Sequence, residues 1–225
     1  MPDDFYKLEP SMIAANWAAL GDDAQKCRRA GIEILHLDVM DGHFVKNLTM
    51  GPDIVTALKK REPDLVLDVH LMIYSPENYL ERFIQAGADE VTIHLEATKE
   101  VSHSLKFIRT CNRKAGLAIK PETRETLLLN YLHQVDKILI MTVHPGFGGQ
   151  KFIEEMLDKV RFIRQKADEE GLTIDIQVDG GINLDTCARA VDAGANRFVA
   201  GTAFFKEEDL QKTHLEYRKL WNQSN

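Results

Sequence analysis

Ionisable side chains recur at positions where a β-strand would turn them toward one side. Residues two apart in a strand point to the same face, so His36, Asp38 and Met40 share one face, as do His70 and Met72. Buried parallel strands are normally filled with Val, Ile and Leu, and a charged group among them is costly unless it is paired or metal-bound. Function is the expected reason for these residues.

Asp179, in the segment Val178-Asp179-Gly180-Gly181, adds a second carboxylate. With His36, Asp38 and His70 it makes two imidazoles and two carboxylates from three predicted strands. Such a mixed nitrogen and oxygen set suits zinc, iron(II), manganese or cobalt, and the ligand types do not choose among them. A core histidine or a buried aspartate would explain any one member, but all four together predict one divalent metal ion per subunit.

Three glycine-rich segments follow the late predicted strands, and they could hold a phosphate. They are Gly146-Phe147-Gly148-Gly149-Gln150, Gly180-Gly181 and Gly201-Thr202. Backbone amides without a nearby Cβ can approach an anion closely, and a following helix N-terminus favours negative charge. Single glycine loops are usually only turns, but three at adjacent positions predict a phosphorylated ligand.

A metal, a phosphorylated small molecule and two carboxylates together favour proton transfer beside a carbonyl group. Asp38 and Asp179 come from strands on different sides of the expected barrel mouth, and could lie on opposite faces of a flat enediolate. One would remove a proton and the other would return it from behind, which inverts one carbon.

The elements that must position these residues alternate between strands and helices. Eight short apolar runs fall at residues 6–11, 34–39, 65–71, 91–95, 116–120, 138–143, 174–178 and 197–200. Amphipathic stretches with helical spacing separate them, such as residues 78–85 with Tyr79, Leu80, Phe83 and Ile84 on one face. We expect this helix to open with Ser75 as its N-cap.

Three of the helices close with the same phrase, in which Gly31, Gly87 and Gly194 follow an alanine just before a strand. A glycine there supplies a left-handed C-cap. The repetition predicts a single α/β domain over residues 1–225, a (β/α)8 TIM barrel of the ribulose-phosphate-binding type. A Rossmann-like sheet is the alternative, but no Gly-x-Gly-x-x-Gly follows the first strand.

The amino-acid composition limits the kinds of molecule that the protein could bind. The 225 residues carry 28 Lys and Arg among 35 Asp and Glu, a formal charge of −7, with no basic stripe. We therefore expect no nucleic-acid partner and no membrane partner. The start at residues 1–4 is acidic, and no apolar run approaches the roughly 18 residues that span a bilayer. The cysteines are three in number and far apart, at Cys27, Cys111 and Cys187, which suits reduced thiols. A cytoplasmic location is predicted.

The sequence resembles the ribulose-phosphate 3-epimerase family from Pro10-Ser11 to about Phe205. The matching segments are residues 36–45, His70-Leu71-Met72, His94-Leu95-Glu96, residues 146–150 and residues 178–181. The resemblance implies reversible epimerisation at C3 of D-ribulose 5-phosphate to D-xylulose 5-phosphate through a 2,3-enediolate, in the pentose phosphate pathway or the Calvin cycle. It also implies a homo-oligomer.

The resemblance further implies a role for each matching residue. His36, Asp38, His70 and Asp179 would bind the metal, with Asp38 as proton acceptor and Asp179 as proton donor. Further residues would contact the sugar, surround its phosphate or line the reacting centre: Ser11, His70, Gly146, Phe147, Gly148, Gly149, Gly180, Gly181, Gly201, Thr202, Met40, Met72 and Met141. His94 is expected either as a core histidine or as a substrate contact.

Several positions depart from the family pattern. Asn16 lies in a segment where a small polar residue and an Asp are usual after Ser11, Lys46 replaces a usual proline, and His144 precedes Pro145 where Asn, Glu or Asp is usual. Lys46 and His144 would add positive charge near the mouth of the barrel, so we expect them to alter substrate affinity or its pH dependence.

Three other functions compete with this interpretation. A D-allulose-6-phosphate 3-epimerase would use the same metal and the same aspartates. An orotidine monophosphate decarboxylase needs Asp-x-Lys-x-x-Asp, and Asp38-Val39-Met40-Asp41 lacks the lysine. A catalytically inactive sugar-phosphate-binding barrel would not need intact Asp38 and Asp179.

Overall fold

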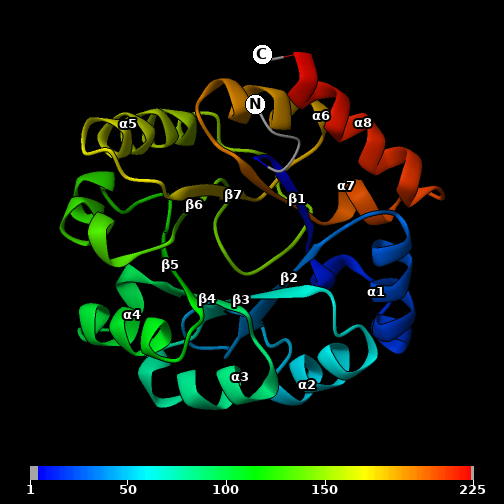
Figure 1. Cartoon of the computed structure of the whole chain (residues 1–225), viewed down its shortest axis with the longest axis horizontal. Helices are drawn as coiled ribbons and strands as arrows, with labels where there is room; N and C mark the ends of the chain where they lie inside the picture. The colour runs from blue at the N-terminus through cyan, green and yellow to red at the C-terminus, as the bar shows by residue number, and fades with distance from the viewer. Residues whose placement is uncertain (1–4, 224–225) are drawn as a thin grey trace.

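Eight parallel strands form one sheet that curls into a barrel in the computed structural model, which describes residues 5–223 (Figure 1). The strands are β1 (Lys7–Pro10), β2 (Ile34–Met40), β3 (Val66–Met72), β4 (Glu90–His94), β5 (Lys114–Ile119), β6 (Lys137–Met141), β7 (Asp175–Asp179) and β8 (Arg197–Ala200). Their order is β1-β8-β7-β6-β5-β4-β3-β2. A parallel bridge between Ser11 and His36 joins the first two strands, so the barrel is nearly closed.

Helices surround the barrel as an outer ring (Figure 1). They are α1 (Leu20–Arg29), α2 (Pro52–Arg61), α3 (Leu80–Ala86), α4 (Val101–Thr110), α5 (Met156–Glu169), α6 (Leu184–Asp192), α7 (Thr202–Phe205) and α8 (Leu210–Gln223). Short 3-10 turns lie at η1 (Met12–Ala14), η2 (Trp17–Ala19), η3 (Pro76–Asn78) and η4 (Leu95–Ala97), and a longer 3-10 segment, η5 (Glu125–Gln134), joins β5 to β6. The predicted (β/α)8 fold is confirmed.

Alternate strand residues divide between two environments. In β3, the apolar Leu67, Val69 and Leu71 belong to the main core, together with helix residues such as Val55 and Leu58. Residues of the other parity point into the barrel, because a strand turns successive side chains to opposite faces. In β2 and β3 these include the polar residues described below.

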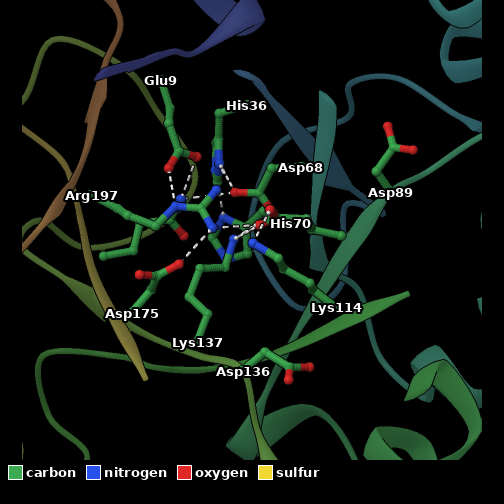
Figure 2. A network of polar contacts seen from close by, with 12 residues as sticks. Glu9, His36, Asp68, His70, Asp89, Lys114, Asp136, Lys137, Asp175 and Arg197 are labelled. Atoms are coloured by element: carbon green, nitrogen blue, oxygen red, sulfur yellow. Dashed lines mark hydrogen bonds and ion pairs between the residues drawn. The ribbon is translucent and has the colours of Figure 1, made fainter. Parts of the chain in front are cut away.

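The interior of the barrel below its mouth is filled with charge (Figure 2). Arg197 forms ion pairs with Glu9 and, at 2.7 Å, with Glu90. Lys137 lies 2.6 Å from Asp68 and 3.2 Å from Glu90. All five side chains are at most 3% exposed. Paired in this way, the charges replace the aliphatic layers usual in such barrels.

Local predictions fared unevenly. Gly31, Gly87 and Gly194 have φ of 84°, 110° and 103°, which confirms the left-handed helix ends. The predicted N-cap at Ser75 is wrong: this residue is itself left-handed (φ 49°), its side chain caps nothing, and the 3-10 turn η3 precedes α3. The expected apolar face also loses Tyr79, which is 43% exposed, because the chain turns there between the two helices.

The cysteines and the helices bear on the predicted cellular compartment. All three cysteines are free, with Cys27 and Cys187 in the core and Cys111 partly buried. Between residues 5 and 223, no helix combines the length and the apolar character needed to cross a membrane. The acidic start at residues 1–4 lies outside the described residues.

Candidate metal centre and active site

Four predicted ligands converge at the carboxyl-terminal mouth of the barrel. One donor atom from each of His36, Asp38, His70 and Asp179 lies within 4.8 Å of the other three. Nδ1 of His70 is 3.2 Å from Oδ1 of Asp38 and 3.7 Å from Oδ2 of Asp179, and Nε2 of His36 is 3.4 Å from Oδ1 of Asp38. The structure therefore brings this whole predicted set together.

The far side of the His36 ring is held by a carboxylate. Nδ1 of His36 lies 2.9 Å from Oδ2 of Asp68, which also accepts a hydrogen bond of 2.8 Å from Nε2 of Gln177. Because a carboxylate can only accept, His36 donates through Nδ1, and Nε2 faces the three other ligands. Asp68 thus aims the ring.

His70 is held by a second chain of contacts. Its Nε2 is 2.8 Å from Nε2 of His94, and Nδ1 of His94 is 3.2 Å from Oε2 of Glu96. His94 is fully buried. It also does not line the cavity, which favours the core role over the substrate contact that was the alternative.

The four residues fit a divalent cation. Burial lowers the pKa of His70 to about 4, so this ring is neutral at neutral pH, as a metal ligand must be. Burial also lowers the pKa of His36, but Asp38 and Asp68 outweigh it and raise that pKa well above its ordinary value. A proton on Nε2 of His36 must leave before an ion binds.

The two carboxyl groups have opposite proton affinities. Burial, reinforced by the charge of Asp38, raises the pKa of Asp179 to about 8. Burial alone would also raise the pKa of Asp38, but the imidazoles of His36 and His70 hold it well below its ordinary value. Before an ion binds, the two neighbouring carboxyl groups therefore differ in proton affinity, Asp179 holding its proton more tightly than Asp38.

A cavity of about 300 Å³ opens beside the ligands. The predicted residues that line it are Ser11, Asp38, Met40, Met72, Met141, Gly146, Phe147, Gly148, Gly149, Asp179, Gly180, Gly181, Gly201 and Thr202. The hydroxyl of Ser11 donates a hydrogen bond to Oδ2 of Asp38. His36 and His70, the other two ligands, are fully buried and are not among the lining residues, although His70 was also predicted to contact the substrate.

The glycines after β7 are required by packing as well as by conformation. Gly180 and Gly181 have φ of 121° and 66°, and a Cβ on them would lie 2.3 Å from Val143 and 2.7 Å from the backbone of Phe152. A Cβ on Gly148, in contrast, would meet no heavy atom within 4 Å. Gly148 lines the cavity and has open space beside it, so an anion could approach the backbone of the loop after β6.

The departures from the family pattern lie away from the cavity wall. Asn16 caps η2 by accepting a hydrogen bond from the amide of Ala18. His144 pairs with Glu122 at 2.6 Å on the surface, and neither it nor Lys46 lines the cavity. The prediction that they add positive charge near the mouth and so alter substrate affinity stays untested.

Sequence reasoning missed three residues. Lys206, just after α7, is the one lysine or arginine among the described residues that line the cavity, and it follows the point where the resemblance ends. Asp68 shares the inward parity of His70, two residues away, and that spacing could have found it. Glu96 lies in His94-Leu95-Glu96, one of the segments that resemble the family, but no role was predicted for it.

In TIM-barrel enzymes the active site lies at the carboxyl-terminal mouth of the barrel, where this protein has its ligand cluster and its open cavity. The fold and the site therefore define a TIM-barrel enzyme. A sequence model of the "Ribulose-phosphate 3 epimerase family" matches residues 7–205. The chain belongs to this family, as its sequence motifs predicted.

Individual proteins similar to this chain include members of the same family. A protein of Bacillus subtilis (strain 168) named ribulose-phosphate 3-epimerase is 42% identical over 94% of this chain and 98% of its own. A protein of the same name from Escherichia coli (strain K12) is 40% identical over 95% of both chains. Among solved structures, KGPDC from Streptococcus mutans matches with a TM-score of 0.71, covering 98% of this chain and 99% of that one at 17% identity, which shows the shared fold.

Proposed function

We propose that this enzyme reversibly epimerises C3 of D-ribulose 5-phosphate, giving D-xylulose 5-phosphate. The observation that carries the proposal is the meeting of Asp38 and Asp179, from β2 and β7, at one cavity rim with two imidazoles. Membership of the family and relatives about 40% identical over most of both chains support the same reaction.

The two aspartates would divide the proton transfer. Asp38 takes the proton from C3, and the C–H electrons form the C2–C3 double bond of a 2,3-enediolate as the C2 carbonyl becomes an oxyanion. Asp179 then gives a proton to C3 from the other face, and the carbonyl re-forms. In the reverse direction the roles exchange, so atoms and charge balance in both.

One divalent ion per subunit, held by His36, Asp38, His70 and Asp179, completes the proposal. When bound, it supplies the positive charge that stabilises negative oxygen in this chemistry. The donor set suits zinc, iron(II), manganese or cobalt. Ser11, through its hydrogen bond to Oδ2 of Asp38, holds that carboxylate in place, and it lines the cavity that would take the sugar.

The phosphate group would lie among the glycine loops. Gly146 to Gly149, Gly180, Gly181, Gly201 and Thr202 line one side of the cavity, and the open space beside Gly148 admits an anion. Lys206 adds a positive charge on the same side. Met40, Met72 and Met141 line the cavity near the aspartates, where they would exclude water from the reacting carbon.

The setting of the enzyme is part of the proposal. A ketose phosphate serves as its small-molecule partner in the pentose phosphate pathway or the Calvin cycle, and the chain works as a homo-oligomer in the cytoplasm. The three free cysteines support a reducing compartment. Sedimentation equilibrium would test the assembly, and a purely monomeric species would contradict it.

The deciding experiment incubates the metal-loaded protein with D-ribulose 5-phosphate in heavy water. We expect D-xylulose 5-phosphate carrying deuterium at C3, and loss of product after chelation and in Asp179→Asn. Asp185→Asn, an exposed change on α6, is the matched control and should keep full activity. Absence of product, with turnover of D-allulose 6-phosphate instead, would overturn the assignment.

A further inference from the structure

A chain of three side chains leads away from the ligand cluster and ends on Glu96. The rings of His70 and His94 are stacked, with centroids 4.9 Å apart and an angle of 26° between their planes. Nε2 of His70 faces Nε2 of His94 at 2.8 Å, and Nδ1 of His94 faces Oε2 of Glu96 at 3.2 Å. Since the two facing Nε2 atoms share a single hydrogen bond, only one of them can carry a proton in that contact.

The direction of this chain matters for Nδ1 of His70. That atom is the one aimed at Asp38 and Asp179, so it needs its lone pair to bind an ion. His70 must then carry its proton on Nε2 and donate to His94. His94 in turn must be unprotonated at Nε2 and donate from Nδ1 to Glu96.

Glu96 is the group that sets this direction. Its Oε1 accepts hydrogen bonds from the amide of Lys120, at 2.8 Å, and from the hydroxyl of Thr123. Burial alone would raise its pKa, but the contacts with His94, Thr123 and Lys120 lower it to about 2. An ionised carboxylate can only accept, so His94 can face it only with an N–H group.

We propose that Glu96 is a positioning residue that, through His94, holds His70 in the tautomer whose Nδ1 is free to bind metal. The inference rests on the metal site of the proposed function. It concerns a residue that does not line the cavity and that lies two ring contacts away from the ligand cluster. Glu96 therefore acts without touching substrate or ion.

Glu96→Gln is the sharpest test because it keeps the shape of the side chain. The amide of Lys120 is a fixed donor, so the carbonyl oxygen of the glutamine must stay beside it, and the NH2 group must face Nδ1 of His94. His94 would then accept at Nδ1 and donate from Nε2. This forces His70 to accept at Nε2 and to carry its proton on Nδ1, where the ion should bind.

Two measurements follow the change. Long-range 1H–15N spectra of histidine-labelled protein report which ring nitrogen of His94 carries a proton, and a chelator competition gives the zinc affinity. We expect the proton of His94 to move from Nδ1 to Nε2, and zinc to bind about 10- to 100-fold more weakly. The matched control is Glu170→Gln, which alters the exposed pair of His133 and Glu170 at 2.8 Å and should change neither result.

A double-mutant cycle separates positioning from loss of packing. His94→Phe removes the connection while keeping a ring beside Phe44, which lies 4.8 Å from His94 between centroids. In that background Glu96→Gln should not weaken zinc binding further. An equal loss of affinity in both backgrounds, or a His94 proton that stays on Nδ1 in Glu96→Gln, would overturn the proposal.

The metal hypothesis and this inference fail in different ways. If the wild-type protein binds no zinc, cobalt, manganese or iron(II), the proposed metal site is wrong, and the need for a free Nδ1 disappears with it. If the wild type binds zinc tightly and Glu96→Gln binds it equally well, the metal site stands and the role of Glu96 is refuted.

Discussion

His36 and Asp68 lie directly opposite each other on adjacent strands, and Nδ1 of His36 is 2.9 Å from Oδ2 of Asp68. Both side chains are fully buried. The same carboxyl group pairs with Lys137 at 2.6 Å, so one residue links a candidate metal ligand to the charges inside the barrel. Through Asp68, His36 is thus connected to the charged residues inside the barrel (Figure 2).

Replacing Asp68 should therefore damage both metal binding and stability. In Asp68→Asn we expect about 10- to 100-fold weaker zinc binding, because the ring of His36 loses its ionised acceptor. We also expect a loss of a few kcal/mol, at most about 3–5, in unfolding free energy, because the buried charge of Lys137 loses its closer carboxylate and keeps only Glu90, at 3.2 Å. Chelator competition and urea unfolding measure the two effects. Asp64→Asn, in the exposed turn before β3, should change neither.

Lys206 should assist substrate binding through its charge. Lys206→Ala should raise KM about two- to fivefold with little change in kcat, since exposed ion pairs contribute about 0.2–1 kcal/mol. The effect should fade as ionic strength rises and be rescued by Lys206→Arg. Steady-state kinetics of both variants, with Lys60→Ala at an exposed position of α2 as control, would show it. An unchanged KM at low salt would remove Lys206 from the phosphate site.

Metal removal should lower stability as well as activity. An ion that binds only the folded state at about 100 times its dissociation constant adds about 2.7 kcal/mol to the unfolding free energy. We expect zinc to raise the melting temperature of chelator-treated protein. The double variant His36→Asn with His70→Asn should show no such rise, and a shift of equal size there would indicate binding elsewhere.

Glu96 should contribute stability that depends on pH. Its pKa is lowered from the ordinary value of 4.5 to about 2, so the folded state binds its proton less readily than the unfolded state does. The contribution is complete above pH 4.5 and is lost as the pH falls toward 2. The stability difference between wild type and Glu96→Gln should accordingly shrink from about pH 6 to about pH 3. Urea unfolding across this range measures it, and a constant difference would contradict the expectation.

The thiols should differ sharply in reactivity. Burial raises the pKa of Cys27 and of Cys187 to about 12, whereas Cys111 is partly exposed. In native protein at about pH 8, a thiol reagent should therefore modify Cys111 first and reach the other two only after denaturation. Cys111→Ser should abolish the fast reaction, and a fast phase that persists would place another thiol near the surface.

Much of the fold follows from patterns that a sequence displays directly. The eight apolar runs overlap the eight strands, because the strand residues that face the helices are apolar even where the inward-facing residues are charged. The left-handed helix ends could also be predicted from their glycines, since few other residues adopt positive φ there. The prediction for Ser75 was wrong because serine is a common N-cap residue, whereas the backbone of Ser75 is left-handed and its side chain caps no helix.

The ligand set was predictable because parity within a strand identifies residues that share a face. His36, Asp38 and His70 were found in that way, and their partners were not. Asp68 pairs with His36 from the adjacent strand, so the contact depends on register, which a single sequence does not display. Glu96 requires still more, since its role depends on hydrogen bonds from Lys120 and Thr123, which follow a later strand.

The buried charges also constrain how the protein is synthesised. Glu9, Asp68 and Glu90 leave the ribosome well before Lys137, and Arg197 comes later still. Until β8 has emerged, Glu9 lacks its ion pair with Arg197, and withdrawing three carboxylates from water against one lysine is unfavourable. We therefore expect the barrel of the nascent chain to stay open and hydrated, and to close only after the last strand has been translated.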